Sequence, residues 1–205
     1  YKESVEASLI KVGDPYDASL LEKEMDRLST IFKNNGYYSF SKKFINYSAD
    51  TNGLGNAVKL KMIISPIAIQ GKDSILYKKH QQYRIANIYI QTDYDYLNPS
   101  SSSDTVIHQN YILIHDSLNY KPRYITDAIH FKKGDLFKSK DVKQTYSHIN
   151  SYGGFVLTEI DFKLKEDDST GQYLNTFIRM SPETKRSVIT STEASTSSGN
   201  YGGAL

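Results

Sequence analysis

The side chains most able to do chemistry include five histidines, namely His80, His108, His115, His130 and His148. None of them forms an HxH or HExxH pair, so the spacing does not support a zinc site. The chain has no cysteine, which excludes disulfides, thiolate metal sites and cysteine nucleophiles. We therefore expect no metal and no cofactor.

Two Gly-Asp steps, Gly13-Asp14 and Gly134-Asp135, resemble acidic active-site loops. Each follows a helix-like segment and begins a turn. Glycine there can take the helix-ending conformation, and aspartate can stabilise the turn or the next helix start. The sequence also lacks a Walker loop, a GxGxxG fingerprint and a GxSxG elbow. The sequence predicts that the chain is not an enzyme.

The Gly-Asp steps belong to a repeat that covers residues 12–66 and again residues 133–182. Each copy has Gly-Asp, one further residue and an aromatic. A helix-like segment follows and ends at Gly36-Tyr37 or Gly154-Phe155, and an alternating strand then runs into Ser-Pro. A repeat at this spacing indicates one supersecondary unit used twice.

The first copy predicts a short helix over residues 3–10 and a longer one from residues 17–19, where Ser19 and Glu22 have capping-box spacing. Strands are expected over residues 44–49 and 58–64. Because a two-stranded sheet is marginal alone, we expect a further strand before Tyr1. The start has neither methionine nor a signal-peptide pattern, so we expect a piece of a longer chain.

The second copy has the same order of elements plus one insertion. The expected elements are a strand over 83–91, a hairpin insertion within 93–121, a short helix over 122–131, a long helix capped by Ser139 or Asp141, and strands over 155–164 and 173–180. The predicted domains are 1–66, a connector at 67–81, 82–182, and a tail at 183–205. The tail is rich in Ser, Thr and Gly.

The overall charge argues against binding to polyanions by the molecule as a whole. The chain carries 25 basic and 23 acidic side chains, a formal net charge of +2. Such a balance creates no general field for nucleic acid or an anionic membrane. No apolar run approaches the roughly 20 residues of a membrane helix.

A pair of KH-like RNA-binding units is the alternative hypothesis. KH units clamp the RNA backbone with a GXXG loop between two helices. Here that position reads Gly13-Asp14-Pro15-Tyr16 or Gly134-Asp135-Leu136-Phe137, without the second glycine and without basic residues.

The order of strand, short helix, Gly-Asp break, long helix ending in Gly-aromatic, and two strands resembles the polypeptide-transport-associated (POTRA) domain. POTRA domains precede the barrel of the outer-membrane assembly factors of the BAM and TAM family. The segments 12–17 (VGDPYD), 34–38 (NNGYY) and 195–202 (STSSGNYG) look like the Bacteroidetes TamA-like branch, with the last similar to the entry into the first barrel strand. The implied fold class is α+β, with two POTRA-like units.

This resemblance implies periplasmic protein-binding modules of an outer-membrane protein insertion and assembly factor. The implied partners are unfolded outer-membrane protein clients and periplasmic or inner-membrane assembly partners. Membrane attachment would come from a C-terminal barrel, and nucleic acid would not be a partner. The implied location is the cell outer membrane, with this part facing the periplasm.

Each such unit would be a small mixed sheet with helices on one face, and its edge strand would leave backbone groups unpaired. An extended client can add there as another strand. With about 1 kcal/mol net per hydrogen bond, capture would be weak and reversible. The expected docking edges are the two strands that contain Phe44, Ile45, Tyr47, Phe155, Leu157, Ile160 and Phe162.

Overall fold

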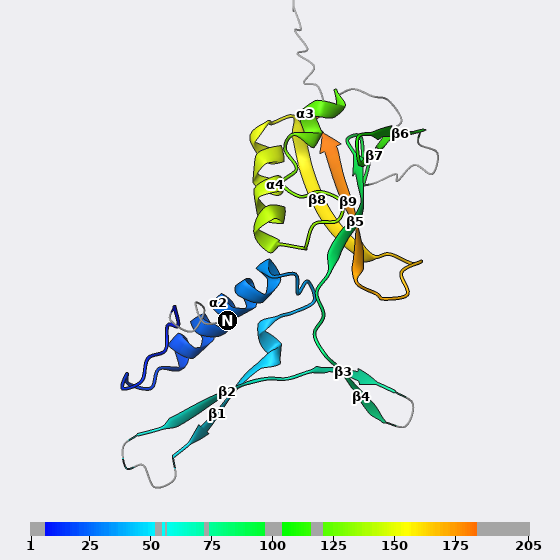
Figure 1. Ribbon diagram of the computed structural model, residues 1–205. Coiled ribbons are helices and arrows are strands. Elements are labelled where there is room, and N and C mark those ends of the chain that lie inside the picture. The colour runs from blue at the N-terminus through cyan, green and yellow to red at the C-terminus, as the bar shows by residue number, and fades with distance from the viewer. Residues whose placement is uncertain are drawn as a thin grey trace, which may run out of the picture.

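The computed structural model describes residues 7–51, 55, 57–71, 74–96, 104–115 and 121–183. These residues form an α+β arrangement of helices and short sheets (Figure 1). The helices are α2 (Ala18–Asn34), the 3₁₀ turn η1 (Lys42–Phe44), α3 (Pro122–Thr126) and α4 (Ser139–Ser151). The strands are β1 (Ile45–Asp50), β2 (Lys59–Ile64), β3 (Ile67–Gln70), β4 (Ile75–Lys78), β5 (Arg84–Gln91), β6 (Asp104–His108), β7 (Tyr111–His115), β8 (Phe155–Leu164) and β9 (Tyr173–Pro182). Among the described residues, no helix has the length and apolar character needed to cross a membrane.

Helix α2 begins after Asp17, whose carboxylate accepts hydrogen bonds from the backbone N–H groups of Ser19 and Leu20. The hydrogen bonds from the Ser19 side chain and from the Ser19 backbone N–H hold the pKa of Asp17 below its usual range. The helix start therefore falls where the sequence predicts it, but the cap is Asp17 and not a Ser19–Glu22 box. One face of α2 packs through Leu28 on a small core with Phe40 and Ile45.

The larger core lies under a five-stranded sheet of order β6-β7-β5-β9-β8. β5 runs parallel to both β7 and β9, whereas the outer pairs β6–β7 and β8–β9 are antiparallel. Alternate residues of β5 and β9 point to the helices and are fully buried, among them Ile88, Ile90 and Ile178. The mixed sheet with helices on one face agrees with the predicted fold class.

Helices α3 and α4 complete this core. Ile125, Ala128 and Ile129 are all buried, as their spacing predicts, but α3 ends at Thr126 and is shorter than the expected helix over 122–131. The N-cap of α4 is Lys138, which makes no capping bond, so the predicted caps Ser139 and Asp141 are wrong.

The predicted hairpin insertion is present as β6 and β7. β7 pairs with the side of β5 that β9 leaves open, and β6 pairs with β7. The insertion therefore extends the sheet at one end, so that its two margins are β6 and β8.

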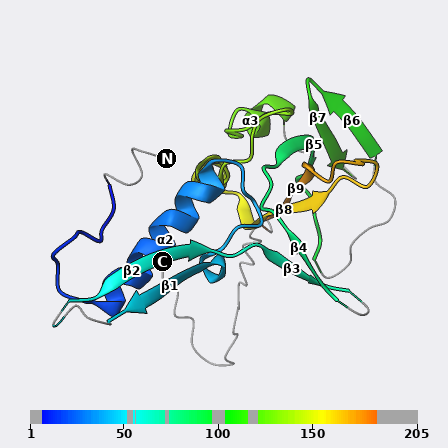
Figure 2. The same ribbon diagram turned by 60° about the horizontal axis from the view of Figure 1, so that its bottom comes forward.

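The first unit has a two-stranded sheet, β1 paired with β2, against α2 (Figure 2). The predicted strand over 44–49 begins one residue later, because Phe44 is the last residue of η1. Residues 7–10 are not helical, and residues 3–6 of the predicted first helix lie outside the described part. The tail prediction also lies outside it, apart from Glu183.

The segment 67–81, expected as a plain connector, contains a β-hairpin of β3 and β4. Ser65-Pro66 follows the end of β2 and predicts the end of the first unit. The residues directly after it, Ile67-Ala68-Ile69, nevertheless form a strand. In Figure 1 this hairpin points away from the rest of the molecule.

The two units meet in a close joint around Gly36. A Cβ atom at Gly36 would lie 2.7 Å from Cδ1 of Leu136 in the second unit. Gly36 O accepts the backbone N–H of Tyr83, and Asn34 Oδ1 accepts the backbone N–H of Lys140 in the first turn of α4. The end of one unit thus supplies the missing cap of the other's helix.

Tyr38 strengthens this joint because its ring contacts the core of the second unit. The ring lies edge-on to Tyr83 and Phe137 and tilted against Phe162. Burial, with smaller effects of Asp161 and Tyr83, raises the pKa of the Tyr38 phenol. An aromatic from the first unit therefore helps to fill the core that supports β8.

Candidate polypeptide-binding edge

Strand β8 forms one margin of the five-stranded sheet, with β9 as its only neighbour there (Figure 1). It runs antiparallel to β9 from Phe155 opposite Pro182 to Leu164 opposite Leu174, with one irregularity between Phe155 and Leu157. Its ten residues are long enough to pair with an extended chain on the free side.

The direction of the β8 amides follows from one hydrogen bond just beyond the strand. Lys165 N donates to Tyr173 O at 2.9 Å, which marks a hydrogen-bonded pair of the ladder. In an antiparallel ladder such pairs alternate with pairs whose N–H and C=O groups point outward. The backbone groups of Thr158, Ile160 and Phe162 therefore face the open side.

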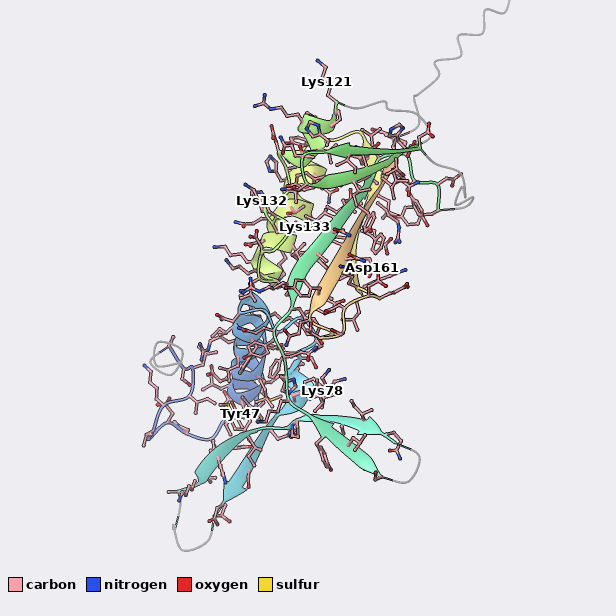
Figure 3. All side chains as sticks on the ribbon, turned by 45° about the vertical axis from the view of Figure 1, so that its right-hand side comes forward. Tyr47, Lys78, Lys121, Lys132, Lys133 and Asp161 are labelled. Atoms are coloured by element: carbon pink, nitrogen blue, oxygen red, sulfur yellow. The ribbon has the colours of Figure 1, made fainter. Side chains whose placement is uncertain are left out.

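One of these outward groups already has a partner within the strand. The Phe162 N–H donates to Oδ1 of Asp161 at 2.8 Å. A carboxylate on a sheet margin that occupies an outward N–H is one way in which proteins protect edges from unwanted pairing. Asp161 is labelled in Figure 3.

A groove of about 530 Å³ runs between this strand and helix α4. Val142 and Tyr146 line it from the helix, and Thr158 and Ile160 line it from β8. The Tyr146 side chain is 46% exposed although it is large and amphipathic. A strand added to β8 would place alternate side chains into this groove.

Thr158 carries an unusual feature within the groove. Its Oγ1 is buried and has no hydrogen-bond partner among the described residues. A buried hydroxyl without a partner is costly, and most are satisfied in folded proteins. Thr158 thus places a buried, unpaired hydroxyl behind the wall of the groove.

The opposite face of β8 is charged and internally compensated. Glu159 pairs with Arg179 of β9 at 3.2 Å, and the Lys163 ammonium lies 5.5 Å from the centre of the Phe177 ring. The groove lining also includes Lys143, Ser147 and Glu159, so the groove is of mixed polarity.

The turn that joins β8 to β9 is held by Asp168. Its carboxylate accepts hydrogen bonds from the Thr170 hydroxyl and from the backbone N–H groups of Thr170, Gln172 and Tyr173. The Thr170 hydroxyl bond, together with the backbone N–H bonds, lowers the pKa of Asp168 to about 2 despite some desolvation. This turn fixes the register of the margin.

The predicted edge residues of the second unit all lie on β8, but they differ in what they contact. Ile160, Phe162 and Phe155 are half-buried and pack against the larger core, whereas Leu157 is 47% exposed. Val156 was not predicted although it is 71% exposed on the same strand. Their role in binding stays a prediction.

The predicted edge residues of the first unit are less available. Phe44 lies outside the strand, and Ile45 is 3% exposed in the small core. Tyr47, labelled in Figure 3, has a buried hydroxyl with no partner among the described residues. It lines a groove of about 640 Å³ between α2 and β2, together with Leu60 and Met62.

Sequence reasoning missed Val142, Tyr146 and Thr158. These residues line one groove only because α4 packs on β8, and a local sequence pattern does not predict that packing.

The metal ligands and the Gly-Asp loop considered from the sequence form no site among the described residues. Within the described ranges no three or more histidine, aspartate or glutamate side chains gather as metal ligands would. The Gly134-Asp135 loop is engaged in structure: Gly134 N donates to Ile85 O, and Phe137 N donates to Tyr83 O. These two amides are bonded to Ile85 in β5 and to Tyr83 just before it. They are therefore not free to bind a phosphate group.

The class of fold follows from these elements: two αβ units, the second a β5-α3-α4-β8-β9 module with an inserted hairpin. No protein-family model matches the sequence, and no curated protein matches it significantly.

Particular solved structures are similar to it. BamA from Haemophilus ducreyi lacking POTRA domains 1-3 matches with a TM-score of 0.58 and 10% identity, over 89% of this chain and 27% of that chain. POTRA1-3 of the periplasmic domain of Omp85 from Anabaena matches with a TM-score of 0.39 and 13% identity, over 89% of this chain and 57% of that chain. The chain thus spans less than two thirds of either matched chain. The first likeness establishes the fold as POTRA-like.

Proposed function

We propose that this chain is a pair of POTRA-type modules of an outer-membrane protein assembly factor, facing the periplasm, and that it captures extended polypeptides on the β8 margin. The observation that carries the proposal is the combination of outward backbone groups on Thr158, Ile160 and Phe162 with the groove under α4. The POTRA-like fold supports the cellular role. The domain limits 1–66 and 82–182 and the TamA-like assignment belong to the same proposal.

The β8 margin is suited to bind many different polypeptides. Backbone hydrogen bonds do not depend on side chains, and a groove of mixed polarity can accept different residues at alternate positions. The three outward residues carry six backbone groups, and five remain after the Phe162 N–H that Asp161 holds. At roughly 1 kcal/mol net each, they give weak binding, because association also costs entropy. Such a site would release its client easily, as a relay requires.

The test of this proposal changes the backbone N–H groups of the peptide and leaves its side chains unchanged. A fluorescent peptide copied from one strand of an outer-membrane protein is compared with two analogues, each N-methylated on one of its two sets of alternate residues. Fluorescence anisotropy should show loss of binding for the analogue whose methyl groups face β8 and retained binding for the other. Equal affinities of all three peptides would refute strand addition.

A further inference from the structure

A cavity of about 590 Å³ lies at the joint between the two units, where the end of α2 meets α4 (Figure 1). Thr30 and Asn34 line it from α2, and residues of α4 line it from the second unit, together with His130 from the loop after α3. The cavity is thus built by both units.

Every side chain that lines this cavity is polar, and none of them is a carboxylate. The ammonium groups are those of Lys140 and Lys143, and both lysines are exposed. The two grooves described above differ, since each is lined by apolar residues and by one glutamate, Glu24 or Glu159. A polar lining with lysines and without carboxylates favours an anion that also accepts hydrogen bonds.

The two lysines lie where a helix disfavours cations. α4 begins after the N-cap Lys138, so Lys140 lies in its first turn and Lys143 in its second. The start of a helix carries a partial positive charge, which attracts acidic side chains and repels lysines. Asp141 is the only acidic residue of α4, and it does not line the cavity. Among the described residues no ion pair involves Lys140 or Lys143. Residues that break a local preference in this way are expected at functional sites.

The histidine side of the cavity is held in place by hydrogen bonds. His130 Nε2 and His148 Nδ1 lie 3.3 Å apart, and His148 Nε2 lies 3.3 Å from the Tyr152 hydroxyl oxygen. The His130 backbone N–H also donates to Oγ1 of Thr145 at 2.9 Å. This wall is therefore ordered before a ligand arrives, which lowers the entropic cost of binding.

We propose that this cavity binds a phosphate group, carried by a free phosphate ion or by a phosphorylated sugar. Lys140 and Lys143 would supply the positive charge, and the hydroxyl and amide side chains around them would supply hydrogen bonds. Because Thr30 and Asn34 belong to the first unit and the lysines to the second, the bound group would bridge the joint.

NMR titration of the isotope-labelled whole chain with inorganic phosphate, glucose 6-phosphate and glucose tests the inference. The two phosphates should shift the backbone amides of residues 30–34 and of Lys140 in a saturable way, and glucose should not. Tighter binding of glucose 6-phosphate would identify a phosphorylated sugar as the source, and equal affinities would identify the phosphate group alone. No saturation by about 10 mM of either phosphate would overturn the inference.

Lys140→Gln and Lys143→Gln should each weaken phosphate binding about fivefold, because each removes one positive charge from the cavity. Lys61→Gln is the matched control: it removes the same charge from an exposed residue of β2 outside the cavity, and it should bind like the unmodified chain. Phosphate binding that all three variants weaken equally, or that the two cavity variants leave unchanged, would contradict the proposal. Lys140 does not line the β8 groove, so Lys140→Gln should bind peptide normally, and this proposal and the proposed function can fail separately.

Discussion

At the scale of single residues, Thr158 tests what a buried hydroxyl without a partner costs the fold. Thr158→Val removes a buried hydroxyl that has no partner, so the free energy of unfolding should rise by about 1 kcal/mol. Peptide affinity should stay unchanged, because the hydroxyl is buried and a client that pairs with the β8 backbone cannot reach it. Thr176→Val is the control: its hydroxyl is also buried without a partner, but in the core under β9. A loss of peptide affinity in Thr158→Val alone would show that a client does reach this hydroxyl.

Asp161 is predicted to restrain the edge. Its carboxylate holds the Phe162 N–H that an incoming strand would need. Asp161→Ala should therefore raise peptide affinity about fivefold, which corresponds to one hydrogen bond of roughly 1 kcal/mol. Asp161→Asn keeps an acceptor and should change affinity less. Isothermal titration of the three proteins measures this, and weaker binding by the alanine variant would show that Asp161 contacts the client instead.

Glu24 makes the first unit sensitive to acid. It is 3% exposed, and burial alone would raise its pKa, but Arg27, the Leu9 N–H and the Ser8 hydroxyl together lower it. A lowered pKa means that the stabilisation is present at neutral pH and is lost as pH falls through the pKa of the folded carboxyl.

Glu24→Gln should therefore cost about 1–3 kcal/mol at pH 7, and the difference from the unmodified chain should shrink near pH 3. Urea unfolding at both pH values provides the measurement. A deficit that is equal at the two pH values would mean that the charge of Glu24 is unimportant.

At the scale of elements, the joint between the units rests on Gly36. It has φ +93°, and a Cβ atom there would approach Leu136 to 2.7 Å. Gly36→Ala should lower the free energy of unfolding by about 2–3 kcal/mol, from the backbone conformation plus the clash. Gly13→Ala is a matched control, since Gly13 has φ +95° with nothing within 4 Å. Equal losses in chemical denaturation would show that the contact with Leu136 is not tight.

The elements also show what the sequence alone could predict. The bounds of β8, the start of α2 and the inserted hairpin agree with local signals: alternation, an aspartate cap and turn-rich flanks. The β3–β4 hairpin was missed because Ser65-Pro66 looked like a terminus. The Asn34 cap of α4 and the groove beside β8 join residues far apart in the chain, so no local pattern contains them.

At the scale of the whole molecule, the described units form a jointed body with margins at β6 and β8 and a projecting hairpin (Figures 1 and 2). Because Tyr38 packs beside Phe162 and Asn34 caps α4, the first unit is tied to the elements that carry the β8 groove. A client held on β8 would therefore keep a defined position relative to the first unit and the hairpin.

Amide hydrogen exchange, followed by NMR with and without a peptide from an outer-membrane strand, tests the central claim most directly. If the peptide adds to β8, the outward amides of Thr158 and Ile160 should gain protection. The Phe162 amide, already bonded to Asp161, and the inward amides, already paired with β9, should change less. That period of two is specific to strand addition. Protection confined to α4, or spread evenly along β8, would contradict the account.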